Sequence, residues 1–331
     1  RENYLGLRLA LIEELEAHLH PQAQLRVLKS LLSDESSNIQ YIFSTHSTLL
    51  GSSIPLKYIH LCVNNNVYSL NPNYTELSEF DYQFLERFLD ATKANLFFAK
   101  GVIIVEGDAE NIIIPALAEV LDRPLHKYGV SIVNVGNKAL LRYANIFKRK
   151  DNSSIPIKVA VVTDLDIEII ENGESQKAEQ EINNKRNNIL QKYNSADQNI
   201  RAFISPLKTL EFDIAMGGLH DIMDKSIQIA KKITTKGEWI NEEELSNLNL
   251  DNHNNENDKI KRSIKIYEPL EKRRASKTVS AQWFAKLIRE EQDIITKLKE
   301  DYRNNTGIKY LIEAVEHVTE TLNWQYDANN G

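Results

Sequence analysis

Two β-branched runs that end in acidic residues constrain the fold of this chain more than any other feature. The first run, Val102–Val105, is followed by Glu106, and the second lies in "VAVVTDLD", which ends with Asp164 and Asp166. A short continuous apolar run is typical of a strand buried on both faces, as in a parallel sheet. The sequence therefore predicts parallel strands with carboxylates at their carboxyl ends.

Predicted strands and helices alternate around these runs. We expect strands at residues 101–106, 129–135, 156–163 and 200–205, and helices at residues 108–121, 138–148 and 174–194. This alternation predicts an α/β fold with a parallel sheet flanked by helices.

The pattern changes on both sides of this region, so we predict three domains: residues 1–93, 94–215 and 216–331. The last is expected to be mostly helical, with helices near residues 279–299 and 308–321. Its Asn-rich and acidic stretch at residues 241–259 is predicted to be a loop.

Bulk composition excludes several classes of protein. The 331 residues are 42% hydrophobic and contain no apolar run of the roughly 20 residues that cross a membrane, so we expect no membrane partner. No signal peptide opens the sequence, and the single cysteine, Cys62, excludes an internal disulfide; both features favour the cytoplasm. The formal net charge of −7 mildly disfavours nucleic-acid binding, although a local basic patch can coexist with it.

Four acids are expected to meet at one edge of the predicted sheet. Glu106 and the pair Asp164 and Asp166 follow two strands, and Glu110 falls in the first turn of the next helix. Such a cluster needs a counter-charge, and Mg²⁺ or Mn²⁺ prefers oxygen ligands. Two ions would suit phosphoryl transfer. The alternative is that Glu106 and Glu110 favour a helix N-terminus and that the aspartates form a solvated turn.

These residues carry a resemblance to a known domain. "VIIVEGDAE" followed by "VAVVTDLD" resembles the TOPRIM domain, a Rossmann-like catalytic fold of topoisomerases, primases and nucleases. The resemblance implies that Glu106, Asp164 and Asp166 bind metal. Glu110 resembles the second acid of OLD (overcoming lysogenization defect) nucleases more than that of topoisomerases.

A second resemblance concerns the start of the chain. "LALIEELEAHLHPQ" and "FSTHS" resemble the Walker B strand and switch histidine of the ABC-type ATPases in OLD proteins, although Leu15 replaces the usual proline. The resemblance implies that Glu13 helps to hold Mg²⁺, that Glu14 polarises water and that His46 senses the γ-phosphate. We expect His18 and His20 to shape a turn. No phosphate loop G-x-x-x-x-G-K-[ST] occurs, so the chain is expected to be a fragment that binds ATP only within a longer protein.

Two further candidates follow the predicted sheet. "SPLKTLEFDIA" resembles an OLD element near the active site, which makes Glu211 a candidate metal ligand; a helix start is an equal alternative. Residues 259–277 hold eight Lys or Arg and two Glu, a basic strip that suits phosphate binding. Lys277 resembles the catalytic lysine of OLD nucleases, and Lys272 and Lys286 are the alternatives.

The resemblance implies a metal-dependent DNA endonuclease coupled to an ATPase, often used against phage, that forms a homodimer or higher homo-oligomer. An alternative is an ATP-gated DNA-binding scaffold with a vestigial TOPRIM site. A topoisomerase is disfavoured, because no segment supplies a recognisable catalytic tyrosine on a separate domain.

Overall fold

The computed structural model describes most of the chain. The described residues are 8–33, 39–136, 139–151, 153–167, 169, 175–194, 199–246, 253, 258–301 and 307–320. The chain forms two compact units, residues 1–99 with 145–156 and residues 100–144 with 157–331.

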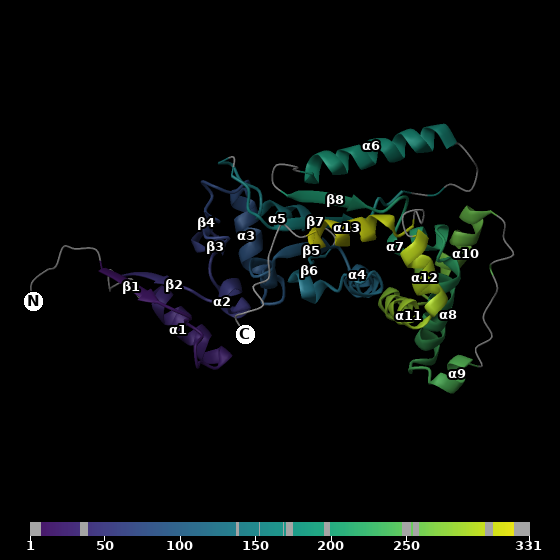
Figure 1. The fold of residues 1–331 in the computed structure, drawn as a ribbon, viewed down its shortest axis with the longest axis horizontal. Coiled ribbons are helices and arrows are strands. Elements are labelled where there is room, and N and C mark those ends of the chain that lie inside the picture. The colour runs from purple at the N-terminus through teal and green to yellow at the C-terminus, as the bar shows by residue number, and fades with distance from the viewer. Residues whose placement is uncertain are drawn as a thin grey trace, which may run out of the picture. The chain divides into compact units, whose positions relative to one another are not determined.

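The first unit begins with two parallel strands and a helix between them (Figure 1). Strands β1 (Arg8–Ile12) and β2 (Ile39–Phe43) pair in parallel, with Arg8 opposite Ile39. Helix α1 (Pro21–Ser33) connects them, and its Leu28 packs with Leu15 and Leu50 in a small core.

The remaining elements of the first unit include a β-hairpin. They are α2 (Thr48–Ser53), η1 (Leu56–Tyr58), β3 (His60–Val63), β4 (Asn66–Ser69), α3 (Glu79–Phe88) and η2 (Lys93–Phe97). Strands β3 and β4 are antiparallel, and the turn residues Asn64 and Asn65 both have positive φ angles, of 50° and 60°. Asparagine tolerates this conformation better than most residues, which explains why it occupies the turn.

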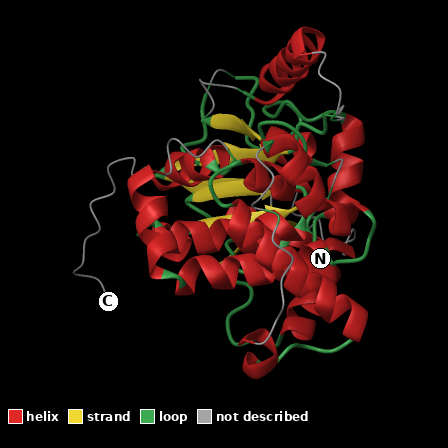
Figure 2. Ribbon diagram, turned by 90° about the vertical axis from the view of Figure 1, so that its right-hand side faces the viewer, coloured by secondary structure: helices red, strands yellow, loops and turns green. Residues whose placement is uncertain are grey.

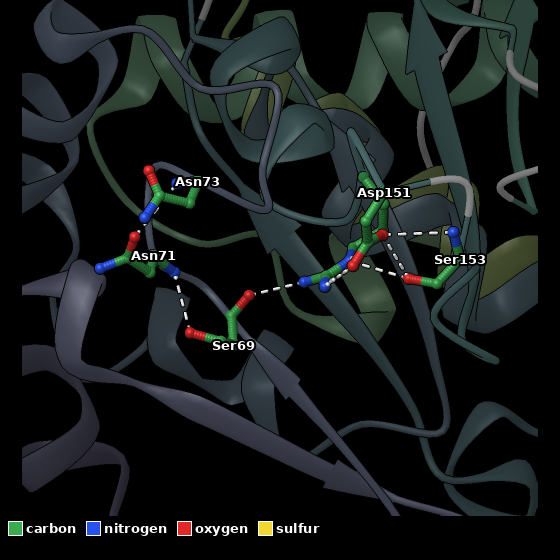
Figure 3. A network of polar contacts seen from close by, with 6 residues as sticks. Ser69, Asn71, Asn73, Asp151 and Ser153 are labelled. Carbon is green, nitrogen blue, oxygen red and sulfur yellow. Dashed lines mark hydrogen bonds and ion pairs between the residues drawn. The ribbon is translucent and has the colours of Figure 1, made fainter.

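A buried arginine fastens residues 145–156 to the hairpin region (Figure 3). The Arg149 guanidinium donates to the Ser69 carbonyl at 2.5 Å and to the Asp151 carboxylate at 2.6 Å. It also lies over the rings of Tyr68 and Tyr74, at 5.8 and 5.3 Å from their centroids. This buried charge is compensated because each of the three guanidinium nitrogens donates to an acceptor. This segment therefore belongs to the first unit although it interrupts the second in sequence.

A four-stranded parallel sheet forms the centre of the second unit. Its strands are β5 (Gly101–Val105), β6 (Val130–Asn134), β7 (Lys158–Thr163) and β8 (Ile200–Ile204), in the order β6-β5-β7-β8. Every residue of β5 is buried, as expected for a central strand covered on both faces. Figure 2 shows the strands enclosed by helices. The predicted α/β class and all four predicted strands are confirmed.

Helices between the strands and after the last strand complete the second unit. Between strands lie α4 (Asp108–Val120), η3 (Leu125–Tyr128), α5 (Leu140–Asn145) and α6 (Ser175–Tyr193). After β8 come α7 (Leu210–Met216), α8 (His220–Lys236), α9 (Glu242–Ser246), α10 (Lys259–Glu271), α11 (Lys277–Glu290), α12 (Gln292–Asp301) and α13 (Lys309–Thr319). Helices α4, α7, α8, α10, α11 and α13 share one apolar core with the sheet.

Three predicted elements differ from the structure. The stretch predicted as a loop contains α9, because Glu242–Leu245 has good helix formers, and most of the remainder of residues 241–259 lies outside the described residues. The helix predicted at residues 279–299 is two helices, since the backbone is extended at Glu291. The helix predicted at residues 138–148 is shorter and ends at Asn145. No helix among the described residues is both long and apolar enough to span a membrane.

Candidate metal centre

The carboxyl ends of β5 and β7 bring the first two predicted acids together. The strands are neighbours with Ile104 opposite Val161, so Glu106 and Asp164 follow at the same edge. The Thr163 hydroxyl at the end of β7 donates a hydrogen bond to the Glu106 carboxylate. Burial raises the pKa of Glu106, the bond from Thr163 opposes this rise, and the Asp166 charge adds to it.

Glu110 reaches the same edge from the first turn of α4. Glu110 is only 8% exposed. Its carboxylate lies close to Gly107, since a Cβ added to that glycine would be 3.1 Å from a Glu110 carboxylate oxygen. Burial raises the pKa of Glu110 to about 7, its own backbone N–H opposes the rise, and the charge of Glu211 reinforces it. Near neutral pH this carboxyl group is therefore close to its midpoint of ionisation.

Asp164 is the third acid of the group whose pKa is raised. Burial raises its pKa well above the ordinary value, and the charges of Glu110 and Glu211 raise it further. Mutual repulsion of this kind requires that the carboxylates lie near one another. The structure thus brings Glu106, Glu110, Asp164 and Glu211 into one electrostatic cluster, which we call the acidic edge together with Asp166.

Asp166 occupies a strained loop at the margin of the acidic edge. Its φ angle is 51°, and its N–H donates to the Lys208 carbonyl at 2.9 Å. The Lys185 ammonium donates to the Asp166 carbonyl at 2.8 Å. Contacts on both sides therefore hold Asp166 in a left-handed conformation, which fixes the loop at the end of β7.

Lys277 supplies positive charge to the acidic edge. Its ammonium donates to the Glu211 carboxylate at 3.2 Å, and Glu211 is 1% exposed. Burial alone would lower the pKa of Lys277, but Glu211 and the other neighbouring charges raise it, so the lysine stays protonated. The alternative lysines make other contacts, Lys272 with Glu268 and Lys286 with Glu290.

The acidic edge suits hard divalent cations in charge and donor type. Its described side chains offer only carboxylate oxygens and far more negative charge than Lys277 balances. In addition, the buried Tyr310 hydroxyl has no hydrogen-bond partner among the described residues, and burial together with the charges of Asp164 and Glu110 raises its pKa. A protonated hydroxyl beside these acids can donate to a carboxylate or to a metal-bound water.

The ligand shell is not closed in this conformation. Among the described residues, no three His, Cys, Asp or Glu side chains are already arranged around one metal position. Repulsion between like charges favours such separation, so ion binding would draw the carboxylates together.

Asp213, a buried acid that was not a predicted site residue, holds the loop that contacts Asp166. Asp213 on α7 is fully buried and accepts hydrogen bonds from the N–H groups of Leu207 at 3.0 Å and Lys208 at 3.4 Å. Burial raises the pKa of Asp213 to about 6, and these bonds limit the rise. Since Lys208 in turn binds Asp166, Asp213 positions the aspartate indirectly. Asp213 follows Glu211 by two residues, and residues at this spacing in a helix do not share a face, so the sequence did not predict this contact.

The other predicted site lies in the first unit, after β1 and β2. The Glu14 carboxylate and the His46 imidazole are 4.0 Å apart and both are exposed. Glu13, the preceding residue, is exposed as well. His20 accepts a hydrogen bond from the Gln22 N–H at 3.4 Å, in keeping with its predicted role in the turn.

Glu16 organises this second site and was missed from the sequence. It accepts hydrogen bonds from the Thr45 hydroxyl at 2.7 Å and the His46 N–H at 2.5 Å. Burial would raise the pKa of Glu16, but these bonds outweigh it and lower the pKa. The clamp ties the acidic turn to the residues that carry His46.

Comparisons with known proteins match both regions. Residues 97–166 match the model of the family described as "Overcoming lysogenization defect protein-like, TOPRIM domain". Residues 5–52 match the model of the family described as "AAA domain, putative AbiEii toxin, Type IV TA system".

Two curated relatives share part of the chain. "Endonuclease GajA" of Bacillus cereus (strain HuB5-5) is 28% identical in an alignment of 191 residues, and the match covers 49% of this chain and 26% of that protein. "Old nuclease" of Escherichia phage P2 is 29% identical in an alignment of 166 residues, and the match covers 48% of this chain and 28% of that protein. The match thus spans about a quarter of each relative.

Solved structures give a weaker likeness. The C-terminal region of the Xanthomonas campestris pv. campestris OLD protein is 23% identical, covers 68% of this chain and 95% of that chain, and has a TM-score of 0.38. The C-terminal region of the Burkholderia pseudomallei OLD protein is 20% identical, covers 66% and 99%, and has a TM-score of 0.35. By its sequence matches, the chain carries an OLD-like TOPRIM domain at residues 97–166 and AAA-domain sequence at residues 5–52, and the predicted resemblance to the OLD family is confirmed.

Proposed function

We propose that this chain is the nuclease part of a metal-dependent DNA endonuclease whose complete form also contains an ATPase. The observation that carries the proposal is the acidic edge, where burial and mutual repulsion raise the pKa values of Glu106, Glu110 and Asp164 beside the Lys277–Glu211 ion pair. Such a cluster costs stability unless a cation occupies it. The names of the two curated relatives support the same reaction class.

In this proposal Glu106, Glu110, Asp164, Asp166 and Glu211 hold two Mg²⁺ or Mn²⁺ ions. Bound ions would activate the attacking water and neutralise the phosphate. Thr163 keeps the Glu106 carboxylate oriented through its hydroxyl. Lys277, protonated and fixed by Glu211, would stabilise negative charge on the phosphate or the leaving oxygen.

DNA is the proposed substrate, and the basic strip at residues 259–277 is one candidate contact for it. Lys261 is exposed on α10, whereas Lys272 and Arg274 both contact Glu268. The strip is therefore partly neutralised, and its exposed lysines would contribute a salt-dependent share of the affinity.

The resemblance supports four further parts of this proposal. They are domain boundaries at residues 93/94 and 215/216, a homo-oligomeric assembly, a cytoplasmic location and a role against phage. Glu13, Glu14 and His46 would serve ATP hydrolysis only with a phosphate loop from elsewhere in the protein.

The test is an assay of supercoiled plasmid with the purified chain in Mg²⁺, Mn²⁺ or Ca²⁺, without ATP. The proposal expects nicked or linear product in Mg²⁺ or Mn²⁺ and none with EDTA. The second candidate, an ATP-gated DNA-binding scaffold, expects binding without product in every metal.

A further inference from the structure

Helix α6 and the acidic edge enclose a pocket that the proposed chemistry leaves unexplained. Its volume is about 450 Å³, within the range of small-ligand sites. Glu106, Asp164 and Asp166 line one side, Leu140 and Leu141 of α5 line another, and α6 provides the third. All of these residues belong to the second unit.

One face of α6 is turned to this pocket. The lining residues Lys185, Asn188, Ile189, Lys192 and Tyr193 follow the spacing i, i+3, i+4, i+7 and i+8, which places them along a single stripe. A stripe that only covered a core would be apolar throughout. This one combines two cations, an amide, an aliphatic side chain and an aromatic ring.

Hydrogen bonds hold α6 in this position. Arg186 donates to the carbonyls of Ser205 and Pro206, both at 3.1 Å, and the Asn194 side chain accepts from the Ala202 N–H at 2.7 Å. The helix is thus fixed to β8 and to the loop after it. The pocket wall is anchored to the same sheet that carries the acids.

The two lysines of the stripe have different surroundings. The Lys185 ammonium already donates to the Asp166 carbonyl at 2.8 Å, so it fixes the loop of the acidic edge. Lys192 is exposed at the end of α6, 5.5 Å from the centroid of the Tyr193 ring. Because Tyr193 itself is only 8% exposed, the apolar surface that a base can reach beside this cation is aliphatic. A nucleic-acid strand can meet the cation with a phosphate and this surface with a base.

Resting on the nuclease function proposed above, we infer that this pocket receives one nucleotide of the DNA strand adjoining the scissile phosphate, unstacked from its neighbours. Its base lies against Leu141 and Ile189, and Lys192 contacts its backbone phosphate. A paired and stacked base cannot enter such a pocket, so the inferred substrate class is DNA with an unpaired or readily extruded nucleotide beside the cleaved bond.

The experiment compares three duplexes in single-turnover cleavage by the purified chain: one fully paired, one with an unpaired nucleotide at a fixed position, and one with an abasic residue there. Cleavage next to the unpaired nucleotide should be at least about fivefold faster than at the other two sites, the lower limit of what one stacked base contributes. Ile189→Ala should reduce this preference.

Lys192→Gln tests the phosphate contact by fluorescence anisotropy with a short single-stranded oligonucleotide in EDTA. The slope of log affinity against log salt should fall by about 0.7, the value for one contact to a single strand, and Lys192→Arg should restore it. Lys127→Gln is the matched control, because η3 precedes β6 and so lies toward the amino edge of the sheet.

The outcomes separate the two proposals. If the wild-type chain cleaves no DNA in any metal, the nuclease function fails, and the anisotropy series still decides whether the pocket binds a strand. If the chain cleaves, but treats all three duplexes alike and Lys192→Gln behaves as Lys127→Gln, the pocket inference is wrong while the nuclease function stands.

Discussion

At the scale of single residues, Glu110 shows why the acidic edge lowers the stability of the metal-free protein. Its carboxyl group is almost completely buried, near the like charges of Glu211 and Glu106 and the opposite charge of Lys277. Burying several carboxylates around one lysine is unfavourable in the absence of metal. A site that binds cations can tolerate this, because the ion supplies the missing charge.

This balance predicts a pH dependence. The pKa of Glu110 is raised from 4.5 to about 7, so between these values the native state binds more protons than the unfolded state. Metal-free stability should therefore fall as the pH rises through this window, by up to about 3 kcal/mol from this group. Thermal melts of wild type and Glu110→Gln in EDTA, at pH 5 and pH 8, measure the difference.

Glu119→Gln on the same helix is the control, since Glu119 is half-exposed and pairs with Arg289. Wild type and Glu119→Gln should lose more stability than Glu110→Gln on going to pH 8. Equal losses in all three proteins would mean that Glu110 does not titrate in this range.

Lys277 should affect catalysis more than metal binding. A protonated lysine cannot ligate a cation, so Lys277→Ala should leave metal affinity nearly unchanged or slightly improved. Cleavage should fall by about 10²–10³-fold if the lysine acts as a preorganised charge stabiliser. Lys261→Ala should instead weaken DNA binding modestly and in a salt-dependent way. Calorimetric metal titration and single-turnover cleavage are the measurements; matching small, salt-sensitive losses would place Lys277 in the basic strip.

At the scale of elements, the sequence predicted the strands well and the supporting contacts poorly. The runs ending in Glu106 and Asp164 are buried strands because only a covered sheet accommodates so many β-branched residues in succession. The backbone break at Glu291 was missed because the helical periodicity continues through it. Asp213 contacts residues of the preceding loop, and Glu16 contacts a residue that is distant in the sequence. Neither contact follows a regular sequence spacing, so neither was predicted.

Gly307, two residues before α13, lies close to the backbone of α7, and this predicts an effect of its substitution. A Cβ at this position would lie 2.2 Å from the Asp213 carbonyl oxygen, so Gly307→Ala must displace backbone. We expect a loss of roughly 1–3 kcal/mol and slower cleavage, because α7 also carries Glu211. Chemical denaturation and plasmid cleavage measure these effects.

Gly237→Ala provides the comparison for Gly307→Ala. Gly237 has a φ angle of 76° at the end of α8, and a Cβ added there would enter open space, so its substitution costs stability through backbone strain alone. It should leave cleavage unchanged at a temperature where both proteins are folded. Loss of cleavage in Gly237→Ala equal to that in Gly307→Ala would show that the effect is general destabilisation.

At the scale of the whole molecule, the chain passes three times between its two units, after residues 99, 144 and 156. One unit carries Glu14 and His46, and the other carries the acidic edge. The two predicted sites therefore belong to different compact units, and every residue of the acidic edge lies in the second unit.

The purified chain should accordingly show neither ATP turnover nor tight ATP binding, because its 331 residues contain no phosphate loop. A coupled phosphate-release assay and equilibrium dialysis with ATP measure this. Robust hydrolysis that disappears in Glu14→Gln would show that another segment of the chain binds the phosphates.

We propose that the acidic edge performs metal-dependent cleavage. The most direct measurement is single-turnover nicking of supercoiled plasmid in Mg²⁺ and Mn²⁺ by wild type, Asp164→Ala and the control Glu119→Ala. We predict that Asp164→Ala abolishes nicking while retaining the wild-type melting temperature or exceeding it in EDTA, since burial and the neighbouring carboxylates make ionisation of Asp164 unfavourable in the native state and the substitution removes this cost. Glu119→Ala should cut as wild type does. An Asp164→Ala protein that cuts at the wild-type rate would contradict the claim.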